Sequence, residues 1–418
     1  MGNTWVRASC GMQLWLINHS NCITNLFLYI LYAIDLIGYT IFSPKAFLSR
    51  RSKLFGPNYA SLGRIIVGEY EKCAELIKSP QKRGNYLGRA KMNPRRFPKN
   101  FLLFLSDAEA GGDDTHAILH QHFWETVVPP AFGRLSDPAF DSYVKEAVST
   151  IIAEGGADHM PASRLTQIVQ HMTAKYVFHS LLGVALTDIQ LKQVDTFFYG
   201  ESPLSAFVAG GVMPFSSLFG CFQCSRNSLF SSLTDMAMNS PALEDYVPSD
   251  ATANLSKQNY AELILSIVGI GGCLGSSNLC LQVLTAIPEG YSIDLENKVE
   301  VTLAVLEAAR LNSPVNNVNS VLQNELTLAI NGKEHSFPQG TVVAASIGLS
   351  CLDPGQFKDP HKFNPKRENF MKTTLTFNHV GFNAVGSGKR QCPGRNIAMR
   401  LASDLLIQYW GECFAVNA

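Results

Sequence analysis

The sequence lacks an excess of charge of either sign and has no segment of simple composition. Lysine plus arginine and aspartate plus glutamate both number 34, so the formal net charge is zero. Nucleic-acid-binding domains carry a basic patch or stripe, and nothing in this balance indicates one. Internal repeats and low-complexity linkers are also missing. The organisation therefore favours one large domain over a string of small ones.

The cysteines form no pattern that predicts disulfides or a zinc site. All ten are scattered along a long chain, whereas disulfide scaffolds are short and cysteine-dense, so a reducing compartment is expected. Cys221 and Cys224 form a C-x-x-C pair, but no second pair follows at zinc spacing. His116 and His120, at i and i+4, lack the glutamate of the H-E-x-x-H motif. Solvated or structural histidines are favoured over zinc ligands.

An apolar stretch near the N-terminus allows two interpretations. Residues 25–42 contain one charged residue, Asp35, and a basic flank follows at Lys45, Arg50, Arg51 and Lys53. Length and flank fit a membrane anchor with a cytosolic catalytic part, although an aspartate at mid-span costs ~3 kcal/mol. The alternative is an amphipathic helix at the edge of the globular domain. The predicted organisation is an N-terminal segment at 1–43 and one catalytic domain at 44–418.

Helical periodicity dominates the rest of the chain. Tyr70, Ala74 and Ile77 recur at i, i+4 and i+7, as a buried helix face requires. Residues 260–287 are apolar on all sides and hold four glycines, which predicts a buried central helix approached closely by another group. Alternating residues around Asn331-Gly332 predict a β-hairpin. The predicted fold is mainly α with a small β-sheet.

The segment VGSGKRQCPGRNIA, from Val385 to Ala398, places Cys392 between a glycine-rich basic turn and the expected start of a helix. A phosphate-binding loop is disfavoured, because Arg390 stands where that motif needs serine or threonine. Helix N–H groups and nearby arginines stabilise an anionic sulfur. The residues alone leave open a catalytic thiol and a thiolate metal ligand.

This segment resembles the haem-binding loop of the cytochrome P450 superfamily, Phe-Gly-x-Gly-x-Arg-x-Cys-x-Gly. Only the first position departs, where Val385 replaces phenylalanine. The resemblance implies the cytochrome P450 fold and haem b with Cys392 as axial iron ligand. It also implies that Arg390 contacts a haem propionate and that Gly388 and Gly394 shape the haem loop.

Other segments resemble the family in the same order along the chain. Glu307 and Arg310 match the E-x-x-R pair, and Arg367 matches the arginine that completes this structural lock behind the haem. The segment DTHAILHQHFW resembles the helix that supplies a propionate partner. That resemblance implies cofactor-binding roles for His116 and His120.

The glycine-rich central helix resembles the distal helix of the family but departs from its oxygen-activating members. Those members carry an acid followed by an alcohol, where this chain has Leu274 and Gly275. Leucine cannot relay protons, and Ser276 or Ser277, just beyond, is the candidate to substitute in part. The Gly271-Gly272 pair and the missing loop phenylalanine resemble the branch that rearranges fatty-acid hydroperoxides, such as allene oxide synthases and hydroperoxide lyases. The resemblance implies catalytic roles for Gly271, Gly272 and Ser276 beside Cys392.

These features predict a haem-thiolate enzyme and favour rearrangement of lipid hydroperoxides without dioxygen or a reductase. Two alternatives stay open: a monooxygenase that uses dioxygen and an external reductase, and a haem-binding protein without turnover. The haem-binding protein without turnover is considered because the stretch from Gly272 to Glu307 is short for the superfamily. A stretch of this length leaves little room for the helices that the family has there. The expected partners are a lipophilic small molecule and a membrane, with a redox partner only for the monooxygenase, and no nucleic acid. The expected location is an intracellular membrane, of the endoplasmic reticulum or a plastid.

Overall fold

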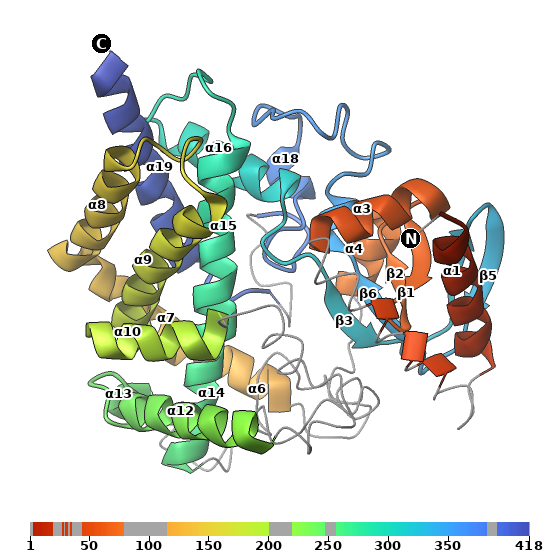
Figure 1. Ribbon diagram of the computed structural model, residues 1–418, viewed down its shortest axis with the longest axis horizontal. Helices are drawn as coiled ribbons and strands as arrows, with labels where there is room; N and C mark the ends of the chain where they lie inside the picture. The colour runs from red at the N-terminus through yellow and green to blue at the C-terminus, as the bar shows by residue number, and fades with distance from the viewer. Residues whose placement is uncertain are drawn as a thin grey trace.

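The protein has a large helical lobe beside a smaller lobe that contains the sheet (Figure 1). The N-terminus lies in the small lobe, and the C-terminus lies at the far end of the helical lobe. The predicted mainly helical fold with a small sheet is confirmed. The computed structural model describes residues 3–19, 27–28, 30–31, 34–35, 44–78, 115–199, 220–246, 256–382 and 391–417.

The helices of the described chain differ widely in length. The α-helices are α1 (Asn3–Asn18), α3 (Pro44–Phe55), α4 (Tyr70–Lys78), α6 (Thr115–His122), α7 (Val128–Gly133), α8 (Pro138–Ala153), α9 (Ala162–Leu182), α10 (Asp188–Val194), α12 (Gly220–Met238), α13 (Leu243–Tyr246), α14 (Lys257–Ser266), α15 (Gly275–Ala286), α16 (Lys298–Leu311), α17 (Ile347–Ser350), α18 (Phe370–Thr373) and α19 (Arg395–Asn417). Three π-helical segments and a 3₁₀ turn connect some of them: η2 (Phe123–Val127), η3 (Arg134–Ser136), η4 (Asp195–Tyr199) and η7 (Ile267–Leu274).

The strands form a four-stranded sheet and a separate hairpin. The sheet has the order β1-β2-β6-β3, in which β2 and β6 are parallel and the other neighbours antiparallel. The hairpin pairs β4 with β5 around Asn331-Gly332. Both turn residues have positive φ, 52° and 75°, as a type I′ turn requires, so the predicted hairpin is confirmed. The strands are β1 (Asn58–Ser61), β2 (Arg64–Val67), β3 (Val318–Val321), β4 (Leu326–Ile330), β5 (Lys333–Phe337) and β6 (Val342–Ala345).

The predicted central helix exists and is buried, but it is not a regular α-helix. Its middle third widens into the π-helix η7, so α14, η7 and α15 follow one another through the helical lobe (Figure 1). Within the described residues, Lys257–Ala286 is the one helix long and apolar enough to cross a membrane. Much of its apolar surface is covered by the protein, which is the environment of a core helix.

The C-terminal helix α19 packs against the helices that surround this core. Ile397, Leu401 and Leu405 are buried on one stripe, as their spacing predicts. The stripe lies on an element that contacts α8, α15 and α16. Because α19 begins three residues after Cys392, this packing restricts the position of the cysteine.

Asp35 is the buried centre of a polar network in the small lobe. Its Oδ1 accepts a hydrogen bond from Arg51 at 2.6 Å, and its Oδ2 accepts from Gln13 Nε2 at 2.9 Å and from Ser61 Oγ at 2.7 Å. Asp35 is only 3% exposed. The charge that made a membrane span costly is therefore held by protein groups; most of residues 25–42 lie outside the described chain.

The same network supports a strained turn in the sheet. Leu62 and Gly63, between β1 and β2, have positive φ values of 56° and 66°, a conformation that leucine rarely adopts. The Leu62 amide donates to Asp35 at 2.9 Å, and the Gly63 amide donates to Gln13 Oε1 at 2.9 Å. The N-terminal helix α1 thus holds the turn in place.

Replacing this carboxylate will destabilise the protein. In Asp35→Ala, Arg51 stays buried without its counter-ion, so the free energy of unfolding should fall by about 3–5 kcal/mol. Urea unfolding followed by circular dichroism measures the change. Asp158→Ala, which alters an exposed aspartate, should change it by less than about 0.5 kcal/mol. Equal effects of the two variants would contradict the buried role of Asp35.

Candidate functional site

Cys392 lies three residues before the first residue of α19, Arg395. Its amide donates to the Phe377 carbonyl at 3.0 Å, which fixes the cysteine backbone against the preceding loop. The Gly394 amide hydrogen-bonds its sulfur. A helix N-terminus favours negative charge on such a group.

The surroundings of Cys392 oppose ionisation of a free thiol. Burial raises the pKa of the Cys392 thiol to about 11, and the Gly394 amide and the Arg395 guanidinium only partly offset that effect. A thiol with this pKa is protonated at neutral pH. A cation bound to the sulfur would reverse that balance, because a coordinating thiol loses its proton to the metal. The site therefore fits a metal ligand better than a free thiolate nucleophile.

The helix α6 and the segment η2 that follows it dock the cysteine loop. His120 is buried, and its Nε2 donates to the Gln391 carbonyl at 2.7 Å, one residue before the cysteine. The Trp124 ring stands edge-on to His120 and lies 5.8 Å from the Arg395 guanidinium. His120 thus contacts the backbone of the cysteine loop, a role that its predicted cofactor contact did not include. The His116 side chain lies outside the described part of the chain.

The donors around the cysteine fit an anionic cofactor that carries a metal. Arg395 donates through Nη1 to the Phe382 carbonyl at 3.0 Å, but its buried Nε has no hydrogen-bond partner among the residues that the structure describes. A buried orphan donor next to a thiol suits a group with carboxylates and a thiophilic ion. The residues present therefore fit haem b. Arg390 and Gly388, the predicted contacts on the other side of the loop, lie outside the described residues.

Glu307, Arg310 and Arg367 meet in a buried lock, as the resemblance implies. Glu307 accepts two hydrogen bonds from Arg310, at 2.7 and 2.8 Å, and one from Arg367 at 3.1 Å. Glu307 and Arg310 are both fully buried. Arg310 also donates to the carbonyls of Cys351 and Pro360. The lock ties α16 to the loop that leads to the cysteine segment.

The glycines of the central helix divide between two faces. A Cβ on Gly269 would lie 1.8 Å from the Phe198 ring, and one on Gly272 would lie 2.5 Å from Val177. Beside Gly271 and Gly275, a Cβ would meet nothing within 4 Å. Gly272 therefore serves close packing against α9, whereas Gly271 borders open space. Only one of the two glycines predicted to be catalytic lies on the open face.

The positions of the missing acid and alcohol lie at the end of η7. Leu274 ends the π-helix, and Gly275 begins α15 with open space beside it. Ser276 is buried, and Ser277 donates through Oγ to the Leu274 carbonyl at 3.2 Å. The open face near Gly275 therefore carries no acidic or alcoholic side chain at the family positions.

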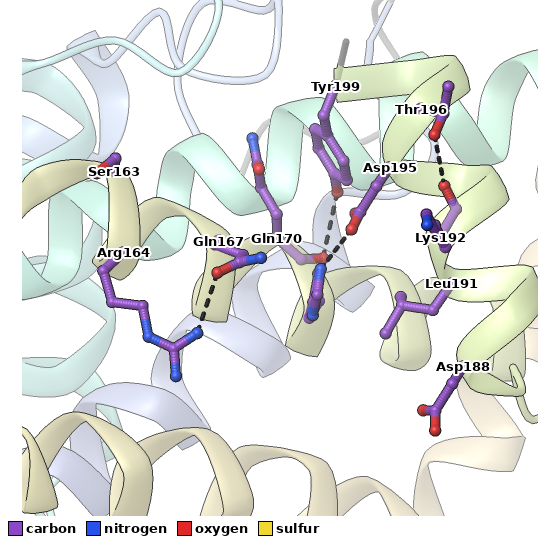
Figure 2. Close-up of a pocket in the computed structure, with 11 residues that line it drawn as sticks. Ser163, Arg164, Gln167, Gln170, Asp188, Leu191, Lys192, Asp195, Thr196 and Tyr199 are labelled. Carbon is purple, nitrogen blue, oxygen red and sulfur yellow. Dashed lines mark hydrogen bonds and ion pairs between the residues drawn. The ribbon is translucent and has the colours of Figure 1, made fainter. Parts of the chain in front are cut away.

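A polar pocket of about 930 Å³ lies elsewhere, between α9 and the α10–η4 segment (Figure 2). Arg164 and Lys192 line it, together with His171 and Asp195, which are hydrogen-bonded to each other. The Tyr199 hydroxyl, also in the lining, donates to the Gln170 carbonyl. Neither Cys392 nor the open face of the distal helix contributes to it. Its charged lining is unsuited to a lipophilic substrate, so we do not assign the reaction to this pocket.

Residues 286–408 match the family model for cytochrome P450. This range contains the Glu-Arg-Arg lock, the cysteine loop and the start of α19. Over this range the chain matches the cytochrome P450 superfamily. The cofactor of this superfamily is haem b with a cysteine thiolate as axial ligand.

Curated relatives are similar to a smaller part of the chain. Ent-cassadiene hydroxylase of Oryza sativa subsp. japonica is 32% identical over 97 residues, which are 23% of this chain and 18% of that protein. (+)-Menthofuran synthase of Mentha piperita is 35% identical over 83 residues, 19% of this chain and 16% of that protein. The chain thus matches less than a fifth of the length of either relative. These matches do not support the hydroperoxide-rearranging branch.

Solved cytochrome P450 structures show the same fold at low sequence identity. CYP164A2 of Mycobacterium smegmatis superposes with a TM-score of 0.59 at 17% identity and covers 91% of this chain and 92% of its own. A mutant of P450 EryK in complex with erythromycin B gives 0.59 at 14% identity and covers 88% of both chains. At such identities the likeness concerns the fold alone.

The glycine positions give a direct test of the distal helix. Gly272→Ala puts a methyl group against Val177, which is almost fully buried, so stability should fall by about 1–3 kcal/mol. Gly271→Ala fills open space and should be neutral or stabilising by up to about 1 kcal/mol. Thermal unfolding of the two variants and the parent measures the difference. A destabilised Gly271→Ala with an unaffected Gly272→Ala would contradict the assignment of faces.

Proposed function

We propose that the chain is a haem-thiolate monooxygenase that oxidises a lipophilic small molecule, and that Cys392 would hold the haem iron. The observation that carries this proposal is the half-buried Cys392 just before α19. The pKa of its thiol is raised, and the Arg395 Nε has no hydrogen-bond partner among the described residues. The similar relatives named hydroxylase and synthase support an oxidation.

Different residues of this chain would make different contacts with the cofactor. Cys392 would bind the iron, while the Gly394 amide would hydrogen-bond the thiolate and moderate its basicity. Arg395 would direct its free Nε at an anionic edge of the group, and Arg390 and Gly388 complete the loop in the proposal. Haem b supplies the redox chemistry when it is bound. His120 and Trp124 would keep the loop in register with α6.

The proposed partners follow from this chemistry. An oxidation with dioxygen needs electrons from an external reductase, so a redox partner belongs to the proposal. The substrate would be lipophilic, as the predominantly apolar walls of small-molecule sites favour. The proposed location is an intracellular membrane, that of the endoplasmic reticulum or a plastid.

Proton delivery in this enzyme would depend on water. The family positions for an acid and an alcohol hold Leu274 and Gly275, and neither side chain can donate a proton. The space beside Gly271 and Gly275 is open on the described chain. Water in that space is the remaining proton source, and its delivery is less directed than that of a fixed hydroxyl.

The lack of an acid and an alcohol at positions 274 and 275 also supports a second candidate function, the rearrangement of fatty-acid hydroperoxides. A substrate that brings its own O–O bond needs no dioxygen, reductase or proton relay. The absence of the acid–alcohol pair at Leu274 and Gly275 is the specific feature that favours it. Among the curated relatives named above, the activities are those of a hydroxylase and a synthase, which is why oxidation is placed first.

One pair of assays separates the two reactions. Purified holoenzyme with NADPH, a cytochrome P450 reductase and a panel of terpenoid and fatty-acid substrates should form oxygenated products only when NADPH and dioxygen are both present. The holoenzyme with linoleic-acid hydroperoxide and no reductase should leave the conjugated-diene absorbance unchanged. Rapid loss of that absorbance with no NADPH-dependent product would overturn the monooxygenase in favour of rearrangement. Inactivity in both assays would support a haem-binding protein without turnover.

If the enzyme is a monooxygenase, a hydroxyl at position 275 should increase the fraction of NADPH that is used to form product. Gly275→Thr adds a hydroxyl where nothing lies within 4 Å of a Cβ, so the fraction of NADPH that ends in product should rise about tenfold. Gly275→Val has the same shape without the hydroxyl and should give no rise. The measurement compares NADPH consumed with product formed. If valine and threonine act alike, directed proton delivery is not what the parent enzyme lacks.

A further inference from the structure

A small groove in the small lobe gathers positive charge without any acid. It has a volume of about 180 Å³ and lies between α1 and the β4–β5 hairpin, which are neighbours in Figure 1. Its lining contains three basic side chains, Arg7, Lys333 and His335, and no aspartate or glutamate. Within the described part of the chain, no carboxylate forms an ion pair with Arg7 or Lys333. The groove is therefore suited to an anion.

The floor of this groove is apolar and uncharged. Leu14 is half-buried, and Phe55 and Ile330 are buried. Cys10 also lines the groove, and burial raises the pKa of its thiol, so the sulfur is protonated at neutral pH. The groove thus combines an apolar floor with the exposed cations of Arg7 and Lys333.

Both walls of the groove belong to regular secondary structure. The α1 wall consists of positions i, i+3, i+4 and i+7, which share one helix face: Arg7, Cys10, Gly11 and Leu14. On the hairpin, Ile330 is paired with Lys333, and His335 lies two residues further along the same face of β5. A Cβ on Gly11 would meet nothing within 4 Å, so the helix leaves open space at this position.

Hydrogen bonds outside the groove hold its walls in place. Gln13, on the other face of α1, donates to Asp35 at 2.9 Å and accepts from the Gly63 amide at 2.9 Å. At the hairpin turn, the Asn331 amide donates to the Phe55 carbonyl at 3.3 Å. The walls are therefore positioned without a ligand, which reduces the entropy lost on binding.

We propose that this groove is a second ligand site, which binds a small amphipathic carboxylic acid. The carboxylate accepts charge-assisted hydrogen bonds from Arg7 and Lys333, and its hydrocarbon part covers Leu14 and Ile330. The volume equals that of roughly six water molecules in the liquid, which limits the acid to a short chain or a single ring. The groove shares no lining residue with the cysteine segment or the distal helix. The site goes beyond the proposed oxidation and does not depend on it.

Isothermal titration calorimetry of the full-length holoenzyme tests the site, with hexanoate and benzoate as the aliphatic and the aromatic probe. At least one of them should bind about tenfold or more tightly than acetate, which lacks the apolar part. Hexan-1-ol and inorganic phosphate should also bind at least about tenfold more weakly than that probe, because each offers only one of the two features. Tight binding of phosphate would overturn the amphipathic ligand in favour of a simple anion.

Two variants locate the binding. Arg7→Gln/Lys333→Gln should weaken the affinity for the carboxylate probe by about tenfold, because both cations are lost. Gly11→Leu should abolish binding by filling the open space, while the urea midpoint stays the same or rises, because leucine favours a helix more than glycine does.

Lys145→Gln/Lys298→Gln is the matched control. It removes the same charge from exposed positions on α8 and α16 in the helical lobe, and it should bind the probe like the parent. Equal weakening by the two double variants would indicate general attraction to a positive protein and would overturn the proposal. Binding that Gly11→Leu leaves unchanged would place the probe elsewhere, the haem site included, and would overturn it, as would a parent that binds neither acid.

Discussion

The structure depends on how one sulfur is held at the start of one helix. Packing of α19 against α8, α15 and α16 fixes the place of Cys392, and the Phe377 carbonyl and Gly394 amide fix its orientation. Burial raises the pKa of the free Cys392 thiol, so the thiol stays protonated at neutral pH. A metal cation resolves that conflict, because the charge that the surroundings penalise is neutralised by the bound ion. The Glu307 lock joins α16 to the loop that leads to the cysteine segment. His120 joins α6 to the same segment through the Gln391 carbonyl.

The distal helix shows how packing and chemistry compete for the same glycines. Because Gly269 and Gly272 have no side chain, Phe198 and Val177 can pack close to the helix backbone at these positions. The helix widens to a π-helix over this stretch, a distortion often found at functional sites. Gly275, on the open face, leaves space where the family has an alcohol. Glycine at position 275 therefore removes a hydroxyl donor from the helix and leaves space that water can occupy.

Much of the site could be predicted from spacing. The cysteine loop, the Glu307–Arg310 pair and the Asn331-Gly332 hairpin are local patterns in which neighbouring residues determine the geometry. The environments of Asp35 and His120 could not be predicted, because their partners Ser61 and Gln391 are distant in sequence. The faces of Gly271 and Gly272 also escaped prediction, since a regular helix was assumed where a π-helix forms. The lean towards hydroperoxide rearrangement rested on a few distal residues, and the relatives found do not support it.

The central claim is that Cys392 holds haem iron as a thiolate. The reduced holoenzyme in carbon monoxide tests it most directly, with Cys392→Ser beside Cys413→Ser, which alters a cysteine towards the other end of α19. The account predicts a thiolate-type Soret band near 450 nm, as haem-thiolate proteins give, in the parent and in Cys413→Ser, and its loss in Cys392→Ser. A parent without that band, or a Cys392→Ser variant that keeps it, would contradict the account.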